Sequence, residues 1–208
     1  MKDHNEEYFY FEAVGINNPM LHGPSHLFYS EEAVDDNLTV ALTFYPKLVP
    51  RNPRIGDVFG MSGHPVISQR LKDHLEKLDL KNVQFVPATI KDHEDVIHEN
   101  FYIIHVYNLV RCANMNKSEW TPFIRDPKQV QCFDKLILDN NVLDKIPLKS
   151  RLVIALKEEN SERLYHRSVV DRILSINPIG GVFYSVKDNL PVKPVEDEFP
   201  EHILNEYN

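Results

Sequence analysis

The chain has 208 residues, enough for one large domain or two small lobes, and its 42% of hydrophobic residues can fill a core. Its formal net charge of −8 at pH 7 disfavours nucleic acid and anionic membranes as partners, since both attract basic surfaces, and is compatible with a basic protein partner. A solvated surface kept for solubility explains the same charge. Seven glycines against fourteen prolines, with neither a dinucleotide fingerprint nor a P-loop, argue against a nucleotide-binding architecture.

The number of cysteines and the length of the apolar segments indicate the cellular compartment. Cys112 and Cys132 are too few for a disulfide scaffold or a four-thiolate metal site. The opening MKDHNEEYFY lacks the basic-then-apolar run of a signal peptide, and no apolar run reaches membrane-spanning length. We therefore expect a soluble, cytoplasmic protein whose thiols are packed or free.

Residues 1–50 contain two β-prone runs, 8–14 and 39–45, which predict strands. Between them lies an acidic loop with four carboxylates: Glu31, Glu32, Asp35 and Asp36. Three prolines then mark either a lobe boundary or a rigid connector: Pro46, Pro50 and Pro53. We expect this region to belong to the same fold as an α+β domain over 51–188.

The stretch 55–90 predicts a loop, a helix, a tight turn and a strand. Four apolar side chains at steps of three and four define the buried helix face: Ile67, Leu71, Leu75 and Leu78. Ser68 is the expected N-cap, because its hydroxyl can accept from a free amide of the first turn. Residues 83–90 then read as a short strand.

Further along, 91–100 is acidic and predicts a turn or a short exposed helix, and 101–110, apolar on both faces, predicts a central strand. Residues 112–129 are polar and irregular in pattern, and they hold the lone Trp120. Two shorter runs, 133–138 and 152–156, also predict strands.

A second helix is expected after Asn160 or Ser161, with an apolar face made by Val169, Val170, Ile173, Leu174 and Ile176. A strand over 182–186 and an acidic, proline-rich surface tail over 189–208 follow. This helix–strand pair echoes the first one, since Asp73 aligns with Asp171 and Phe85 with Phe183. The echo is either an internal duplication or the pattern that any amphipathic helix leading into a strand produces.

These elements predict an α+β fold: a mixed, mainly antiparallel sheet with two or more packed amphipathic helices. Two similar lobes are an open alternative.

Catalytic and metal-binding patterns are weak. His22 and His26 lie in a loop, and His93 and His98 have poor spacing for one helical face, so we predict no metal site. The segment 60–64, GMSGH, lacks the second glycine of a nucleophile elbow, and nothing near Cys112 lowers its pKa. We predict no catalytic or cofactor-binding residues, and we expect His105 to be a hydrogen-bonded core histidine.

Exposed aromatic side chains rimmed by carboxylates suit a protein interface. Trp120 fits this description, although it could equally be a plug over the core. The candidate partner-binding residues are Glu31, Glu32, Asp35, Asp36, Asp92, Glu94, Asp95 and Trp120.

The segment VFGMSGHPVISQRLKDHLEKLDLKNVQFVPATI, followed by FYIIHVYNLV, resembles a bacterial immunity-protein family whose members sit beside polymorphic toxins. The similarity extends through the Trp-containing segment to the later portion ending in Gly180-Gly181-Val182-Phe183, and it covers about 57–186. It rests on packing residues and carries no catalytic residue over.

The resemblance implies that the protein occludes a cognate toxin, basic and nuclease-like, belonging to a secreted or contact-dependent effector. Two alternatives stay open. One is a hydrolase-type enzyme that reverses toxin damage, which requires a pocket where His64 or His105 meets a carboxylate. The other is a regulatory or interaction subunit without catalytic activity.

Overall fold

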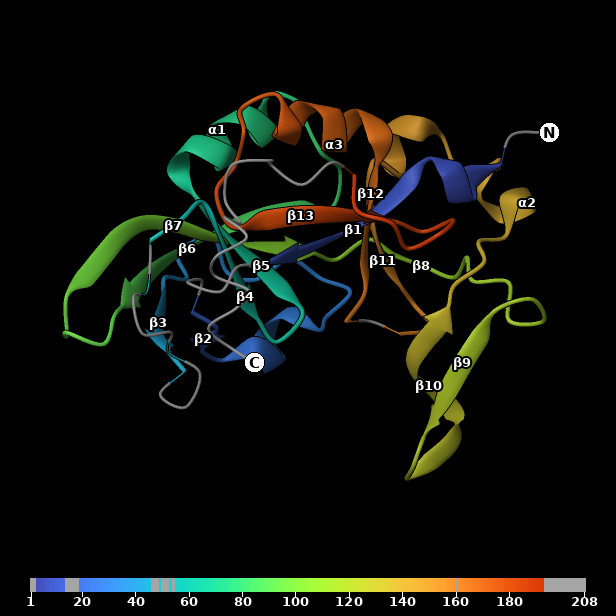
Figure 1. Ribbon diagram of the computed structural model, residues 1–208, viewed down its shortest axis with the longest axis horizontal. Helices are drawn as coiled ribbons and strands as arrows, with labels where there is room; N and C mark the ends of the chain where they lie inside the picture. Colours follow the sequence, from blue (N-terminus) through green and yellow to red (C-terminus); the bar gives the residue numbers. More distant parts are fainter. Residues whose placement is uncertain are drawn as a thin grey trace, which may run out of the picture.

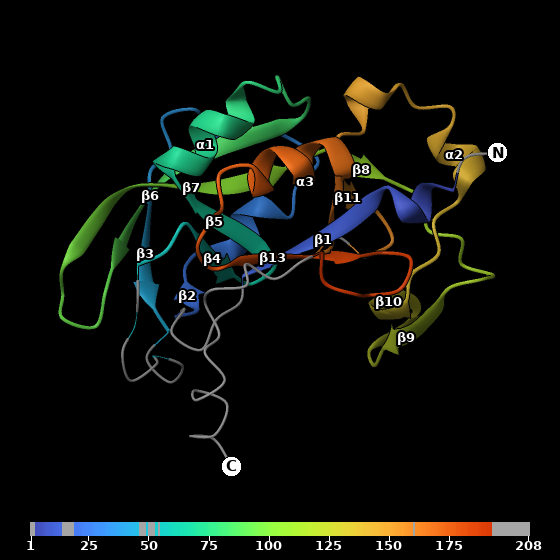
Figure 2. The same ribbon diagram turned by 45° about the horizontal axis from the view of Figure 1, so that its top comes forward.

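The computed structural model describes residues 3–13, 19–45, 49, 53, 55–159 and 161–192, with the side chain of residue 25 excepted (Figure 1). Two mixed sheets and a separate two-stranded hairpin form the frame of the fold, and the two longest helices cover one side of the sheets (Figures 1 and 2). The predicted α+β class and the mainly antiparallel pairing are confirmed, but the strands form two sheets and a hairpin instead of the one sheet expected.

The six-stranded sheet has the order β2-β3-β6-β7-β5-β4. All neighbours in it are antiparallel except β3 and β6. Its strands are β2 (Leu21–His22), β3 (Val40–Phe44), β4 (Val58–Met61), β5 (His64–Ser68), β6 (Val83–Lys91) and β7 (Ile97–Val106).

The five-stranded sheet has the order β13-β1-β12-β11-β8, and only β11 and β8 are parallel. Its strands are β1 (Tyr8–Ala13), β8 (Leu109–Val110), β11 (Val153–Leu156), β12 (Arg163–His166) and β13 (Gly181–Ser185). The remaining pair, β9 (Glu119–Phe123) and β10 (Asp126–Lys135), forms a hairpin that projects from the body (Figure 1).

Two eight-residue helices, α1 (Gln69–Glu76) and α3 (Arg167–Leu174), lie side by side over the sheets (Figures 1 and 2). The Ser68 hydroxyl accepts from the Leu71 amide, which confirms the predicted N-cap, and His166 caps α3 in the same way. Short helical segments complete the set: α2 (Asn140–Leu143), η1 (His4–Glu6), η2 (Ser25–Phe28) and η3 (Leu148–Ser150).

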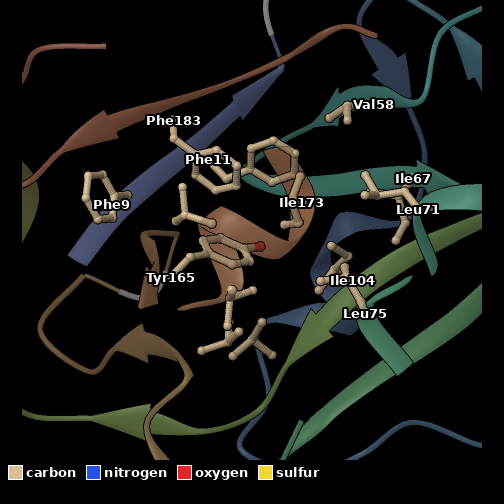
Figure 3. Packing of buried hydrophobic residues seen from close by; sticks show 14 of the residues in the cluster. Phe9, Phe11, Val58, Ile67, Leu71, Leu75, Ile104, Tyr165, Ile173 and Phe183 are labelled. Atoms are coloured by element: carbon tan, nitrogen blue, oxygen red, sulfur yellow. The ribbon is translucent and has the colours of Figure 1, made fainter. Parts of the chain in front are cut away.

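One apolar cluster draws on both sheets and both long helices (Figure 3). Phe11 of β1 stacks on Phe183 of β13 with ring centroids 4.4 Å apart, and Leu75 of α1 and Ile173 of α3 are buried in the same cluster. The half of the chain with α1 and the half with α3 therefore share this cluster. Each sheet also has a cluster of its own on its opposite face: alternate strand residues such as Phe59 and Val66 enter one, and Tyr8 and Ile154 enter the other.

The predicted echo corresponds to a shared topology. In the first unit the chain runs β5-α1-β6, and β7 lies between the two strands. In the second it runs β12-α3-β13, and the intervening strand is β1 from the N-terminus. Both units are split β-α-β motifs preceded by an antiparallel hairpin strand, β4 or β11. Setting Asp73 on Asp171 superposes α1 on α3 residue for residue.

The structure corrects several local predictions. The β4–β5 hairpin stands in place of the loop expected before α1. The second helix begins at Arg167, not after Ser161, because residues 163–166 form β12. Of the two alternatives for 91–100, the turn is correct: a tight turn joins β6 to β7, whose first residues also fall in this stretch. The segment 112–129, read as irregular, holds β9 and the first part of β10, and the strand expected over 133–138 is the end of β10, which stops at Lys135. Asn160, Pro46, Pro50 and tail residues 193–208 lie outside the described residues.

The expected strand over 101–110 is divided. β7 is central in the six-stranded sheet as predicted, but it starts at Ile97 and ends at Val106. Leu109 and Val110 then pair with β11 in the other sheet. The crossing is held by Asn108, whose side-chain amide donates to the carbonyls of Ser150 and Val153.

Candidate functional site

The acidic loop between η2 and β3 lies at the junction of the two sheets, and its four predicted carboxylates are all exposed. Glu31 accepts from Lys157, 2.8 Å away, just beyond β11. The Glu32 carbonyl bonds His105 of β7, and Gln84 of β6 donates to the Asp36 carboxylate and to the Val34 carbonyl. The loop is therefore fixed by contacts to both sheets while its carboxylates face solvent.

The second predicted group lies in the β6–β7 turn. Asp92 accepts from the amides of Glu94 and Val96, and its other oxygen lies 2.7 Å from Nε2 of His98. These contacts engage the Asp92 carboxylate within its own turn. Asp95 pairs with Lys91 at 2.8 Å, and Glu94 is exposed.

Trp120 lies on β9 of the projecting hairpin, directly opposite Phe133 of β10. It is half-buried and belongs to none of the core clusters formed by the described residues, so the alternative of a plug over the core is wrong. Phe133, its partner across the strands, packs against a core cluster at the base of the hairpin.

The eight predicted residues thus occupy three places instead of one surface. The β6–β7 turn is at one end of the long axis of the molecule and the β9–β10 hairpin at the other (Figure 1). The acidic loop lies at the junction between them. Contact of any of these residues with a partner stays a prediction.

A cavity of about 260 Å³ lies where the two units meet. The β4–β5 turn closes one side: Gly63 has a positive φ of 85°, and a Cβ there would approach the Ser161 Cβ to 3.2 Å. Ser161 precedes β12, so equivalent hairpins of the two units touch. His64 and Glu162 line the cavity from opposite sides of this contact.

His64 is buried, and its Nδ1 lies 3.2 Å from an Arg163 guanidinium nitrogen. Arginine only donates, so Nδ1 accepts and the proton resides on Nε2. Desolvation, with Arg163 and His105 nearby, lowers the pKa of His64 to about 3. Nε2 has no hydrogen-bond partner among the described residues, which leaves a buried N–H donor at the cavity.

Glu162 is partly buried where β1 and β12 diverge, since their pairing ends at Tyr10 and Leu164. Burial raises the pKa of its carboxyl to about 7, and the neighbouring carboxylates Glu159 and Glu12 act in the same direction. A carboxyl of this kind gains from a cation that replaces the lost solvation.

The cavity brings a histidine and a carboxyl together, as the enzyme alternative requires. However, His64 presents Nδ1 to a cation and has a low pKa, which makes it a weak general base at neutral pH. Burial, with Glu158 and Asp139 nearby, raises the pKa of Cys112 to about 12, so its thiol is a poor nucleophile.

Two further predictions concern histidines. His105 is buried and hydrogen-bonded, as expected of a core histidine. Within the described part of the chain, no group of three or more histidine, cysteine or acidic side chains is arranged to hold a metal ion.

The sequence interpretation missed Glu12 and Glu162. Glu12 is the only charged residue in the β-prone run 8–14, and it stands on the face of β1 opposite Phe11. A charge within a strand was a usable sign. The proximity of Glu12 to Glu162 could not be predicted from the sequence, because it depends on the pairing of strands that are far apart in the chain.

Residues 21–188 match the immunity protein family Imm11. The match spans most of the described fold, including α1, α3 and every strand except β1, so the chain belongs to this family. The family places it in the class of proteins that give immunity to a toxin, in agreement with the resemblance read from the sequence. No curated protein matches the chain. Every described helix is too short or too polar to cross a bilayer.

Proposed function

We propose that the protein binds a cognate toxin in the cytoplasm of the cell that makes both, and neutralises it by covering the toxin's active site. The observation that carries the proposal is the family match over residues 21–188. The net charge of −8 supports a basic, nuclease-like toxin, since opposite charges speed association and disfavour wrong partners. The toxin belongs to a secreted or contact-dependent effector, and neither nucleic acid, membrane nor a cofactor takes part.

The acidic loop supports this mode of action. It is held on both sheets by Lys157, His105 and Gln84, so its exposed carboxylates are presented with little conformational freedom to lose on binding. Preorganised charges of this kind add specificity at low entropic cost.

Co-expression with the product of the neighbouring upstream gene tests the proposal. We expect the cells to survive and the two proteins to co-purify as a one-to-one complex that weakens as salt increases. Death of the cells despite soluble expression of the immunity protein, with no complex recovered, would contradict it.

A second candidate is an enzyme that reverses toxin damage, favoured by one observation: the carboxyl of Glu162, with a pKa of about 7, faces the same cavity as His64. A carboxyl of this kind can exchange protons near neutral pH. This candidate predicts survival without a stable complex, and loss of protection in Glu162→Gln. A regulatory subunit would instead bind a host protein and give no protection.

A further inference from the structure

We propose that the groove between the β9–β10 hairpin and the five-stranded sheet receives a basic segment of the cognate toxin, with Glu12 and Glu162 as its anchors. The inference rests on the proposed function and assigns the surface and the partner chemistry to it. This groove is a different surface from the acidic loop, whose carboxylates the sequence predicted to contact the partner.

The groove has a volume of about 560 Å³. Tyr10, Glu12 and Glu162 of the sheet face one side, and β10 near Phe133 together with the turn after β13 near Asp188 face the other. Alternate residues of β1 lie on the face of the sheet that borders the groove: Tyr8 is buried within a core cluster, Tyr10 is half-buried and Glu12 is exposed. The groove begins where the apolar cover of the sheet ends.

The charge of the groove calls for a cationic occupant. Five carboxylates line it against two lysines, and one of these, Lys187, is paired with Glu6. Among the described residues, Glu12 and Glu162 make no ion pair. They also repel each other, because both stand near the point where β1 and β12 diverge. An arginine or lysine side chain of a partner relieves this repulsion and supplies the missing counter-charge.

A second observation is independent of the carboxylates. The cavity at the junction shares Tyr10, Glu12 and Glu162 with the groove and therefore lies next to it. It is lined by His64, which is 1% exposed and whose Nε2–H lacks an acceptor in the described structure. Nε2 has almost no accessible surface in the free protein, so a peptide carbonyl of the bound segment satisfies this donor once the side chains around it shift to admit it. The two features together match a basic peptide segment better than a free cation.

The hairpin wall adds an apolar contact. Its tip exposes Phe123 and Ile124, with 42% and 91% of each residue accessible. The base of the hairpin packs on a core cluster through Phe133, whereas the tip does not, so a bound partner that covers Phe123 and Ile124 would bury apolar surface left exposed in the free protein. A second copy of this chain does not suit the groove, because its excess of carboxylates would face another excess of carboxylates.

The test is isothermal titration of the full-length protein with the catalytically inactivated product of the neighbouring toxin gene. Glu12→Gln and Glu162→Gln should each weaken binding roughly tenfold or more, since each leaves a basic group of the partner without its counter-charge. Glu99→Gln is the matched control, an exposed carboxylate on β7 outside the groove, and should bind as the unchanged protein does. Glu12 is exposed, so its variant folds even if Glu162→Gln does not.

The pH dependence gives a readout that a structural role would not produce. Cation binding requires the ionised form of Glu162, so affinity should rise between pH 6 and pH 8 and flatten in Glu162→Gln. The other titratable and charged groups around Glu162 come from every neighbouring element. They are Glu12 and Tyr10 of β1, Glu159 before β12 and Arg163 in it, His64 of β5, Glu119, Asp134 and Lys135 of the hairpin, and Lys187 and Asp188 after β13.

The outcomes separate this inference from the proposed function. If the unchanged protein binds and protects while Glu12→Gln and Glu162→Gln do so equally well, the groove is not the docking surface and the proposed function stands. If the unchanged protein neither binds nor protects, the proposed function itself fails. A dimer detected by sedimentation, with a second copy of the chain seated in the groove, would also overturn the inference.

Discussion

The two split β-α-β units have the same strand order but carry different polar residues. Where they are apolar they agree: Leu75 matches Ile173 and Phe85 matches Phe183 when α1 is set on α3. At the junction cavity they differ, because His64 of the first unit corresponds to Glu162 of the second.

This contrast separates the residues that build the fold from those available for function. The matching apolar residues bury one shared cluster and thereby fix the topology. The differing residues contribute nothing to that cluster and leave a buried N–H and a crowded carboxyl at the cavity. Polar groups of this kind cost stability, and this cost is why we propose the junction as part of a binding surface.

The largest expected effect tests whether the core is shared. Leu75→Ala and Ile173→Ala should each lower the free energy of unfolding by about 2–5 kcal/mol, because both side chains are fully buried. Thermal unfolding followed by calorimetry should show one transition, and the two losses should not add, since both residues belong to one cluster. Two transitions with additive losses would instead indicate separate lobes.

Asp57 provides the next test, because the second unit has Ala155 in its place. Its carboxylate is 10% exposed, pairs with Arg70 and accepts from the Ser68 hydroxyl at 2.6 Å and from the Ile179 amide at 3.0 Å. Asp57→Ala should lower the free energy of unfolding by about 3 kcal/mol in chemical denaturation, because it leaves these donors unpaired.

The pH dependence of this loss follows from the pKa of Asp57. Burial alone would raise it, but the hydrogen bonds from Arg70, Ser68 and Ile179 lower it overall. A carboxyl with a lowered pKa in the folded state contributes stability above its unfolded value, and that stability disappears as pH falls. The cost of Asp57→Ala should therefore shrink below about pH 4. A constant cost down to pH 2 would contradict the assigned ion pair.

Glu162 should behave in the opposite way. Burial and its carboxylate neighbours raise its pKa to about 7, so the folded state holds a proton that the unfolded state has already lost above its ordinary pKa of 4.5. Stability from this group falls as pH rises from 4.5 to 7. Glu162→Gln should therefore raise the melting temperature at pH 8 relative to the unchanged protein, and change it less at pH 5. Equal shifts at both pH values would contradict the raised pKa.

The smallest effect on stability is expected at the hairpin tip. Ile124 is 91% exposed, so Ile124→Ser should change the free energy of unfolding by less than about 0.5 kcal/mol. It should nevertheless weaken the toxin complex measurably in titration, because Ile124 lies at the tip of the hairpin that walls the groove. Unchanged affinity would place the tip outside the interface.

Local patterns predicted much of this fold. The apolar spacing around Leu71 and the hydroxyl of Ser68 gave α1 and its cap, and the aromatic run after Glu7 gave β1. The β9–β10 hairpin was missed because its residues are mostly exposed and its pairing has register shifts, so no clean alternation marks it. The cavity was missed because Glu12, His64 and Glu162 meet only through the pairing of distant strands.

Neutralisation by occlusion is tested most directly by titrating the purified toxin with increasing amounts of the immunity protein and recording residual toxin activity. The account predicts that activity falls linearly and ends at one immunity protein per toxin, as tight binding over the active site requires. Full protection of the toxin's target at a small fraction of that ratio would show turnover, and would contradict neutralisation by occlusion.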